Sequence, residues 1–265
     1  MSRCKCPGVN LLKHLLMDYI KIIPDKETLV FQKTKPMKYS DFERTISPER
    51  LCRYVSACSN KKQKAMTLYR YNIKLSQEIF ALISCFEVSL RNKIDLEMRF
   101  HFGRDWLRDF ILPGGRFETD SRVAGTKKII DNAYFNLLRN NSYSNTKLLA
   151  EMEFGVWKFM FNNVQFRLSG RHLLNIFPNK PRSSRSQQYN NVFIFNELDC
   201  INQLRNRVAH HEPICFGNHN NIDLSKVTDC YYKMTQLLKW MDIDAKALWY
   251  GLDHVDVISD KIIMI

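Results

Sequence analysis

The long stretch from Gln63 to about Phe100 constrains the fold of this chain more than any other feature. Its apolar residues recur three or four positions apart, the spacing that places side chains on one face of an α-helix. The members of this stripe are Met66, Tyr69, Ile73, Ile79, Leu82, Ile83, Phe86, Leu90 and Ile94. The stretch therefore predicts one long amphipathic helix, whose length leaves room for a bend near Asn72.

Helix signals also dominate the chain outside this stretch. The segment Ser47-Pro48-Glu49-Arg50 combines a capping side chain, a proline in the first turn and an acidic residue near the positive end of the helix dipole. It predicts a helix that runs to about Cys58. Further helices are expected at about 123–139, 144–168, 192–211, 224–241 and 244–252. Loops are expected at Gly103, at 113–115 and along the basic, polar connector 179–188.

These signals predict an all-α helical bundle. The chain has 265 residues, of which 45% are hydrophobic, and this is enough to bury a sizeable core. We expect an irregular N-terminal arm at 1–40, a single helical domain at 41–255 and a C-terminal tail at 256–265. The only candidate strand, Leu29 to Phe31, has no convincing pairing partner.

The charge balance of the chain is strongly basic. Lysine and arginine number 40 against 27 acidic residues, which gives a formal net charge of +13. A field of this sign attracts polyanions such as RNA and speeds encounter with them. The same charge can serve solubility alone, so the composition leaves both interpretations open.

The cysteine pattern and the short apolar runs indicate a protein of the reducing cytosol. The chain has eight cysteines, and no two of them have the Cys-x2-Cys spacing of a zinc ribbon. Four of them fall in apolar helical stretches: Cys52, Cys85, Cys200 and Cys230. Charged residues between Lys13 and Asp18 interrupt the only leader-like start, and the longest uncharged apolar run, Ile79 to Phe86, is too short to span a membrane. We therefore expect a cytoplasmic protein without membrane contact.

The segment Leu204 to Pro213 (LRNRVAHHEP) gathers polar side chains at the end of a predicted helix. On a helical wheel, one side carries the apolar residues Ile201, Leu204 and Val208. The opposite side carries Asp199, Gln203, Asn206 and His210. Pro213 disfavours helix at the residue before it, so the helix should end near His210 or His211.

Such a segment holds the groups that cut RNA without a metal. In that reaction the 2′-hydroxyl attacks the adjacent phosphorus, so a base, an acid and a cation beside the phosphate are needed. Histidine titrates near neutral pH and suits both proton transfers, while arginine matches a phosphate with its planar fork. Arg205 and His210 are the candidates for these roles. Asn206, one turn before His210, is placed to orient the imidazole or to donate to the phosphate.

The spacing of Arg205 and His210 does not by itself establish a catalytic pair, for two reasons. On a straight helix, Arg205 and His210 point about 140° apart, so either the helix end unwinds or two copies of the segment face each other. In addition, an arginine and a histidine at this kind of spacing are expected about once by chance in such a chain. Arg167 and His172 form a second match, interrupted by Gly170.

The residues around Arg205 and His210 support a catalytic role for this pair. The order Arg205-Asn206, three residues, His210 and then His-Glu-Pro resembles the signature of HEPN domains, and more narrowly that of the Abi-like family of bacterial abortive-infection proteins (AbiD/AbiF type). Motifs in matching order extend the resemblance over about residues 40–250. They are Ser47-Pro48-Glu49-Arg50-Leu51 with Tyr54, the stretches 65–72 (AMTLYRYN) and 86–92 (FEVSLRN), Gly103-x2-Trp106 and Glu153-Phe154-Gly155-x-Trp157.

The resemblance implies a HEPN-type helical bundle that dimerises and brings two Arg-x4-His segments into one composite cleft. It also implies metal-independent RNA cleavage, without a cofactor, in phage defence or toxin-like growth arrest. Carried onto this sequence, Arg205 and His210 are the catalytic pair and Asn206 is their partner. The motif is intact at these positions.

Several other residues can be interpreted either as part of the site or as purely structural. Glu87, Arg91 and Asn92 either support the Arg205 helix or touch RNA, or they form only an internal Glu87–Arg91 pair. His211 is either a second proton donor or a capping group near the negative helix end, and we favour capping. A metal at His210, His211 and Glu212 is disfavoured, because adjacent histidines on a helix point about 100° apart and no third ligand is evident.

Basic residues elsewhere are candidate phosphate contacts, although a solvated face explains any one of them equally well. They are Lys61, Lys62, Lys64, Lys127, Lys128, Lys180, Arg182 and Arg185. We predict RNA as substrate, a homodimer, and an antitoxin protein or regulatory RNA that restrains the activity. The alternatives are a basic module that binds RNA without cutting it, and an interaction protein of a toxin–antitoxin pair. The presence of both Arg205 and His210 favours the ribonuclease.

Overall fold

The computed structural model describes residues 36–217 and 221–265, and over these ranges the chain is helical. The only β-type pairing among them is an isolated antiparallel bridge between Phe216 and Ile222, so the predicted all-α class is confirmed. The chain forms two compact units, residues 1–45 and 46–265. Of the first unit, residues 36–45 are described, and they include all of helix α2 (Tyr39–Ile46) except its last residue. The candidate strand at 29–31 and most of the predicted arm lie outside the described residues.

The second unit is organised on the long helix α4 (Lys62–Phe102), which runs for 41 residues. The predicted long helix is therefore confirmed, and Asn72 does not interrupt it. Its buried residues follow the helical spacing seen in the sequence, from Leu68 through Phe86 to Met98. The helix ends at Gly103, whose φ of 84° is costly for any residue with a Cβ.

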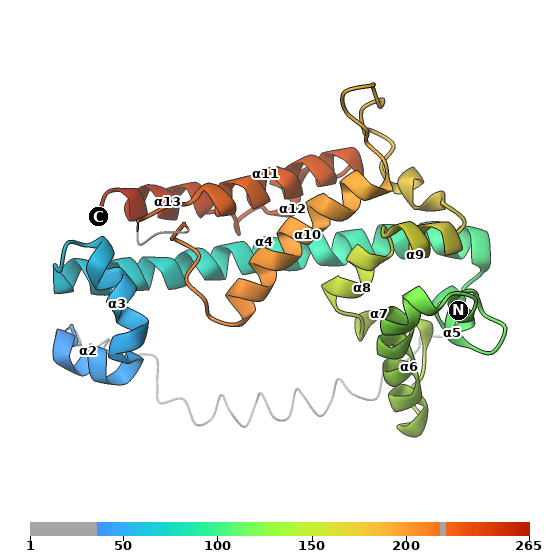
Figure 1. Ribbon diagram of the computed structural model, residues 1–265, viewed down its shortest axis with the longest axis horizontal. Coiled ribbons are helices and arrows are strands. Elements are labelled where there is room, and N and C mark those ends of the chain that lie inside the picture. The colour runs from blue at the N-terminus through green and yellow to red at the C-terminus, as the bar shows by residue number, and fades with distance from the viewer. Residues whose placement is uncertain (1–35, 218–220) are drawn as a thin grey trace, which may run out of the picture. The chain divides into compact units, whose positions relative to one another are not determined.

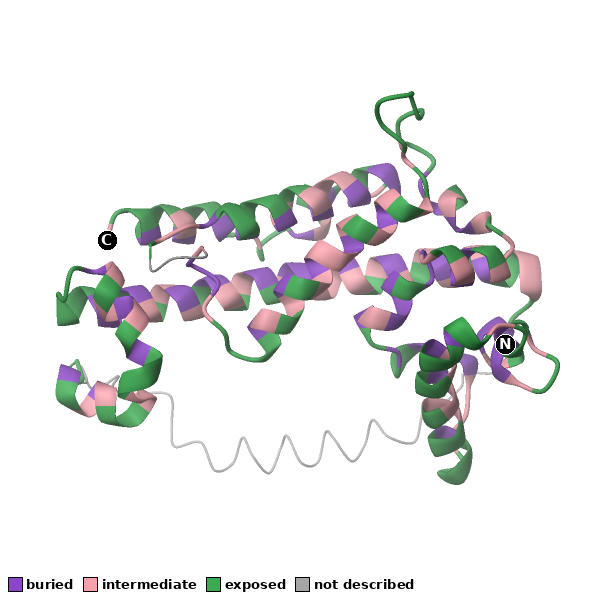
Figure 2. Ribbon diagram, viewed as in Figure 1, coloured by how far each residue is buried: buried purple, intermediate pink, exposed green. Residues whose placement is uncertain are grey.

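Among the described helices that pack directly against α4 are α3 (Pro48–Ala57), α10 (Asn191–Ala209), α11 (Ser225–Trp240) and α13 (Val255–Ile263). In Figure 1, α11 and α13 run alongside α4 while α10 crosses it, and in Figure 2 buried positions recur along each of these helices. The start of α3 follows the sequence signal, because the Ser47 side chain accepts a hydrogen bond from the Arg50 amide and Pro48 opens the helix. Residues 256–265, set apart above as a tail, carry most of α13, which buries Ile258 and Ile262.

The remaining elements are short. They are α5 (Trp106–Ile111), α6 (Ala124–Arg139), α7 (Asn145–Ala150), α8 (Phe154–Phe159), α9 (Asn163–Leu168), α12 (Ala245–Leu248) and the 3-10 turns η1 (Arg116–Glu118), η2 (Ser121–Val123) and η3 (His172–Ile176). The single helix expected at 144–168 is wrong, because α7, α8 and α9 replace it. Glu153 has extended backbone, and the Asn162 side chain accepts from the Val164 amide, so each of these residues begins a new helix.

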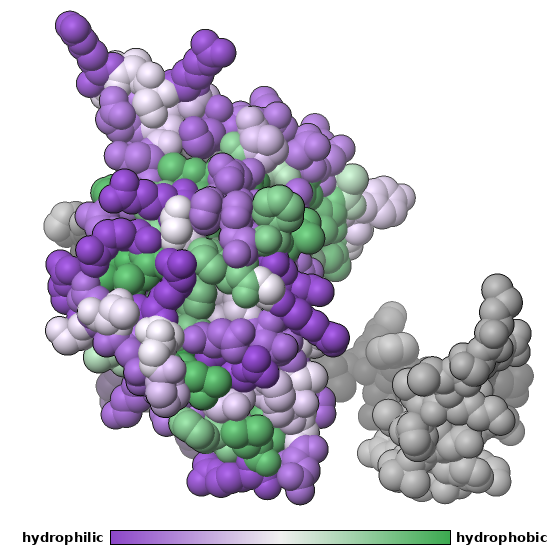
Figure 3. All heavy atoms as spheres, turned by 90° about the vertical axis from the view of Figure 1, so that its right-hand side faces the viewer, coloured by the Kyte–Doolittle hydropathy of each residue, from purple (hydrophilic) through white to green (hydrophobic). Residues whose placement is uncertain are grey.

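At the α5–α6 end of the second unit, small patches of hydrophobic residues lie among hydrophilic ones on the surface (Figure 3). None of the helices in residues 36–217 and 221–265 combines the length and apolar character needed to cross a bilayer.

Candidate active site at the end of helix α10

Helix α10 ends where the sequence predicted, one residue before His210. The amide of Glu212 donates to the Arg207 carbonyl at 2.8 Å and that of His211 to the Val208 carbonyl at 3.0 Å. These two bonds form the Schellman arrangement that closes a helix C-terminus. The residue with left-handed backbone in that arrangement is usually glycine, and here it is His211, with φ of 57°. The turn is therefore well closed but places a bulky residue in a costly conformation.

The chain that follows this turn is held by side chains from other parts of the unit. The buried Asn72 of α4 accepts two amide hydrogen bonds with its Oδ1, from Ile214 at 2.9 Å and from Cys215 at 3.1 Å. From α3, the Arg50 guanidinium donates to the His211 carbonyl, and Arg53 donates to the Gly217 carbonyl at 2.6 Å. The turn carrying both histidines is thus fixed between α3 and α4.

Two adjoining hollows flank the turn. The first, of about 530 Å³, is lined by Asn72, Ile73, Ser76, Gln77, Phe80, Arg205, Val208, Ala209, His211 and Glu212. The second, of about 370 Å³, is lined by Glu49, Arg50, Cys52, Arg53, His210, His211, Glu212 and Pro213. Arg205 therefore lines the first hollow and His210 the second, while His211 borders both.

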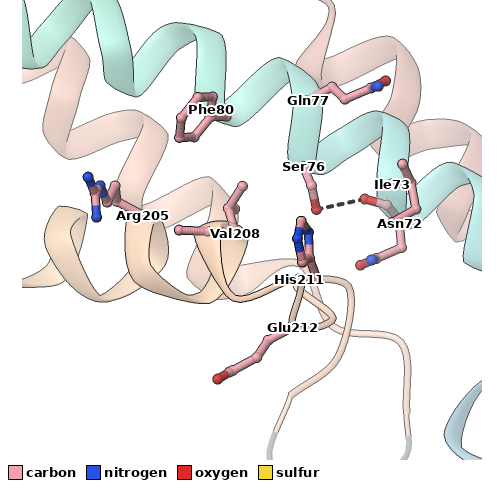
Figure 4. Close-up of a pocket in the computed structure, with 10 residues that line it drawn as sticks. Asn72, Ile73, Ser76, Gln77, Phe80, Arg205, Val208, His211 and Glu212 are labelled. Atoms are coloured by element: carbon pink, nitrogen blue, oxygen red, sulfur yellow. Dashed lines mark hydrogen bonds between the residues drawn. The ribbon is translucent and has the colours of Figure 1, made fainter. Parts of the chain in front are cut away.

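Figure 4 shows how the first hollow is arranged. Arg205 and His211 extend from α10 and its turn toward α4, with Val208 between them, whereas Glu212 points away. The predicted pair Arg205 and His210 is not brought to one point within a single chain. His210 and His211 are both exposed, and among the described residues no hydrogen bond or ion pair engages either imidazole ring.

The surroundings of Arg205 include the acidic residue singled out in the sequence. Burial raises the pKa of the Glu87 carboxyl on α4, and the positive charges of Arg205 and Arg91 offset part of that rise. Glu87 thus lies near both of these arginines, and its supporting role stays a prediction. The Arg205 guanidinium also donates to Asn206 Oδ1 at 3.4 Å, so Asn206 contacts the arginine rather than His210.

The other predicted contacts lie elsewhere. Asn92 is exposed on α4 and lines neither hollow. Lys127 pairs with Asp131 at 2.8 Å, which leaves it less suited to a phosphate. The connector before α10 is exposed at Arg182 and Arg185, yet Arg205 lies roughly 20 Å further along the helix axis. Lys128 on α6 and the half-buried Lys180 also line neither hollow.

The lysines at the start of α4 are exposed and line neither hollow: Lys61, Lys62 and Lys64. The basic side chains that do line a hollow with His210 are Arg50 and Arg53 of α3, which the sequence indicated only as part of a helix. Their spacing of three residues puts both on one face of α3, but the neighbour of that face is decided by tertiary packing.

The second arginine–histidine match has another role. Arg167 forms an ion pair with Asp120 at 2.8 Å, and the His172 ring stacks on His101 with 3.5 Å between ring centroids. Asp199, placed on the polar side of α10 by the wheel, is likewise engaged, because its Oδ1 accepts from the buried Lys158 at 2.7 Å.

Comparison with known proteins identifies the family of the chain. Neither the curated proteins nor the solved structures gave a significant match. A family model described as "Abi-like protein" matches residues 37–215. That range is more than half of the chain and includes α4, α10 and the turn with His210 and His211. The resemblance to the Abi-like family is therefore confirmed. The family's name refers to abortive infection, a phage-defence response, and links the chain to it. The chain belongs to the Abi-like protein family.

Proposed function

We propose that this chain is a metal-independent endoribonuclease of the HEPN type that acts in abortive infection. The observation that carries the proposal is the gathering of Arg205, His210 and His211 around two adjoining hollows at the end of α10. In the proposed reaction the imidazole of His210 accepts the proton of the attacking 2′-hydroxyl or donates a proton to the leaving oxygen. The guanidinium of Arg205 balances the charge that develops on the phosphate.

We further propose that the working site is composed from two chains. Arg205 and His210 line different hollows, so one chain does not direct both at the same phosphate. The first hollow also presents apolar surface beside Arg205, since Phe80 is 45% exposed there next to Val208. An apolar patch beside an arginine has the composition of a protein–protein interface core. A second copy with its turn against this patch would add its own histidine to the Arg205 hollow.

The first test is cleavage of labelled RNA by the purified full-length protein in EDTA. We expect products with 2′,3′-cyclic phosphate ends, and losses of about 100-fold or more in R205A and in H210A. Two exposed residues outside the site serve as matched controls, Arg139→Ala and His254→Ala, and both should cut as wild type does. Cleavage unchanged in R205A and H210A, or lost in EDTA alone, contradicts the proposal.

The second test separates a composite site from a site within one chain. R205A and H210A are mixed and allowed to exchange subunits. In a composite site, a mixed dimer regains one intact arginine–histidine pair, so the mixture should recover roughly a quarter of wild-type activity. If both residues act within one chain, the mixture stays as inactive as its components.

A protein that binds RNA without cutting it would give a different result. Its affinity would fall steeply with salt while the RNA stayed intact, and H210A would bind as wild type does. The basic charge of the chain is compatible with that outcome, but it gives no reason for available histidines at the end of α10.

A further inference from the structure

Three side chains with metal-ligand chemistry meet at the C-terminal end of α4, away from the proposed active site. Glu97 and His101 lie one helical turn apart on α4, with Nε2 of His101 at 3.0 Å from Oε1 of Glu97. His172, at the start of η3, stacks on His101 with an angle of 12° between the rings. One ligand atom from each of the three residues lies within 4.8 Å of the other two.

The surrounding chain holds these groups in place. The amide of Asn175, from η3, donates to Glu97 Oε1 at 2.9 Å and so orients the carboxylate. Gly170 leaves room for His172, because a Cβ at this position would lie 2.6 Å from Cδ2 and Nε2 of the ring. The side chains of His101 and Glu97 are 23% and 19% exposed, which shields them from bulk water yet leaves a path for an ion. The end of the unit where they lie faces the viewer in Figure 3.

We propose that Glu97, His101 and His172 bind a divalent transition-metal ion, with Zn²⁺ as the best match. Two imidazoles and one carboxylate are a common zinc donor set, and a solvent molecule completes the tetrahedron. With bonds of about 2.1 Å, ligand atoms in such a site lie about 3.4 Å apart. Glu97 and His101 are already close to that spacing. The hydrogen bond from Asn175 is the outer-shell support that metal-binding carboxylates usually have.

Binding requires one local change. Stacked rings direct their nitrogen lone pairs in parallel, whereas a shared metal needs them to converge. The two imidazoles must therefore rotate apart when the ion binds, and the ion then fastens η3 to α4. This inference does not rest on the proposed ribonuclease activity. Gln77, in the first hollow, lies about 30 Å along α4 from Glu97, so the metal has no contact with that chemistry.

The test is a titration of EDTA-stripped, tag-free full-length protein with Zn²⁺, followed by calorimetry and by the absorption of Co²⁺ as a substitute. We expect one equivalent bound, and affinity at least tenfold weaker in H101A, H172A and E97Q. E97Q keeps the size of the side chain, so its loss of binding is not a folding defect. His254 lies 3.2 Å from Glu78, with no third ligand in the described part of the chain, and H254A is the matched control that should bind as wild type does.

Cys4 and Cys6 are close in sequence and could bind zinc themselves, so the titration uses a C4S/C6S background. Excess Zn²⁺ should also raise the melting temperature of this protein by about 5 °C or more, and not that of E97Q. No binding in wild type, or equal binding in wild type, H101A and H172A, overturns the proposal. Cleavage of RNA in EDTA reports on the proposed function alone, so the two proposals can fail separately.

Discussion

Removing the Asn72 side chain tests how the candidate site is held. Asn72 is 2% exposed, and its Oδ1 accepts from the amides of Ile214 and Cys215, which are buried themselves. In Asn72→Ala both amides lose their acceptor. A buried unsatisfied donor costs about 1–3 kcal/mol, and water entering the neighbouring hollow recovers part of it. We therefore expect the free energy of unfolding to fall by about 2–4 kcal/mol.

The assay is chemical unfolding followed by circular dichroism, with thermal melting beside it. A loss of 2–4 kcal/mol corresponds to a drop of about 5–12 °C for a unit of this size. Ser76→Ala is the matched control, because Ser76 lines the same hollow and, among the described residues, its hydroxyl bonds only to the Asn72 carbonyl one turn earlier. That change should stay within about 0.5 kcal/mol.

Hydrogen exchange gives an independent readout of the same contact. The amides of Ile214 and Cys215 should exchange much faster in N72A, whereas amides in the middle of α4 should be less affected. If N72A is as stable as S76A and the two amides keep their protection, the Asn72 side chain does not hold this segment. The turn would then be held by the Arg50 and Arg53 contacts instead.

Three further changes probe the same region. His211→Gly should raise the free energy of unfolding by up to about 1 kcal/mol in denaturant melts, because glycine adopts the left-handed conformation at this position without strain; a fall would mean that ring contacts outweigh the strain. Asp199→Asn should cost about 1–3 kcal/mol at pH 7 by leaving the buried Lys158 unpaired. Because the hydrogen bond from Lys158 lowers the pKa of Asp199, this difference should shrink as melts are taken below the ordinary aspartate pKa, and a pH-independent difference would contradict it. Burial raises the pKa of Glu87, so wild type should lose stability relative to Glu87→Gln as the pH rises through that pKa, and the opposite trend would mean that its arginine neighbours dominate.

The features that sequence alone predicted are those set by the local periodicity of apolar residues and by residues that begin or end helices. The stripe from Met66 to Ile94 required a long helix, and α4 is that helix. Pro213 required α10 to stop shortly before it, and the stop falls after Ala209. The failure at 144–168 has a local cause as well. Apolar residues continue at helical spacing through this stretch, but the Asn162 cap starts a new helix, and caps compete with periodicity in a way that a hydrophobic pattern does not record.

The features that sequence missed are set by tertiary packing. Asn72 stood out only as a possible bend, although its side chain holds a segment more than a hundred residues later in the chain. Glu97 and His101 stand at positions i and i+4 of α4, a spacing that by itself does not single out a metal site. The third group, His172, lies on a different element, and only the packing of η3 against α4 brings it there. Pairs within one helix are thus readable from sequence, whereas the residue that completes a site is not.

The geometry at the end of α10 bears on whether Arg205 acts with a histidine of its own chain or with one of a second chain. An unwound helix end was one way to join Arg205 with His210, but the Schellman bonds close the helix and leave His210 in the other hollow. A second chain is then the remaining way to join that pair. His211 is the competing partner, because it already shares the hollow of Arg205. If mixed R205A and H210A dimers regain activity, the pair acts across the dimer. If they do not, and H211A is inactive while H210A is not, Arg205 works with His211 inside one chain.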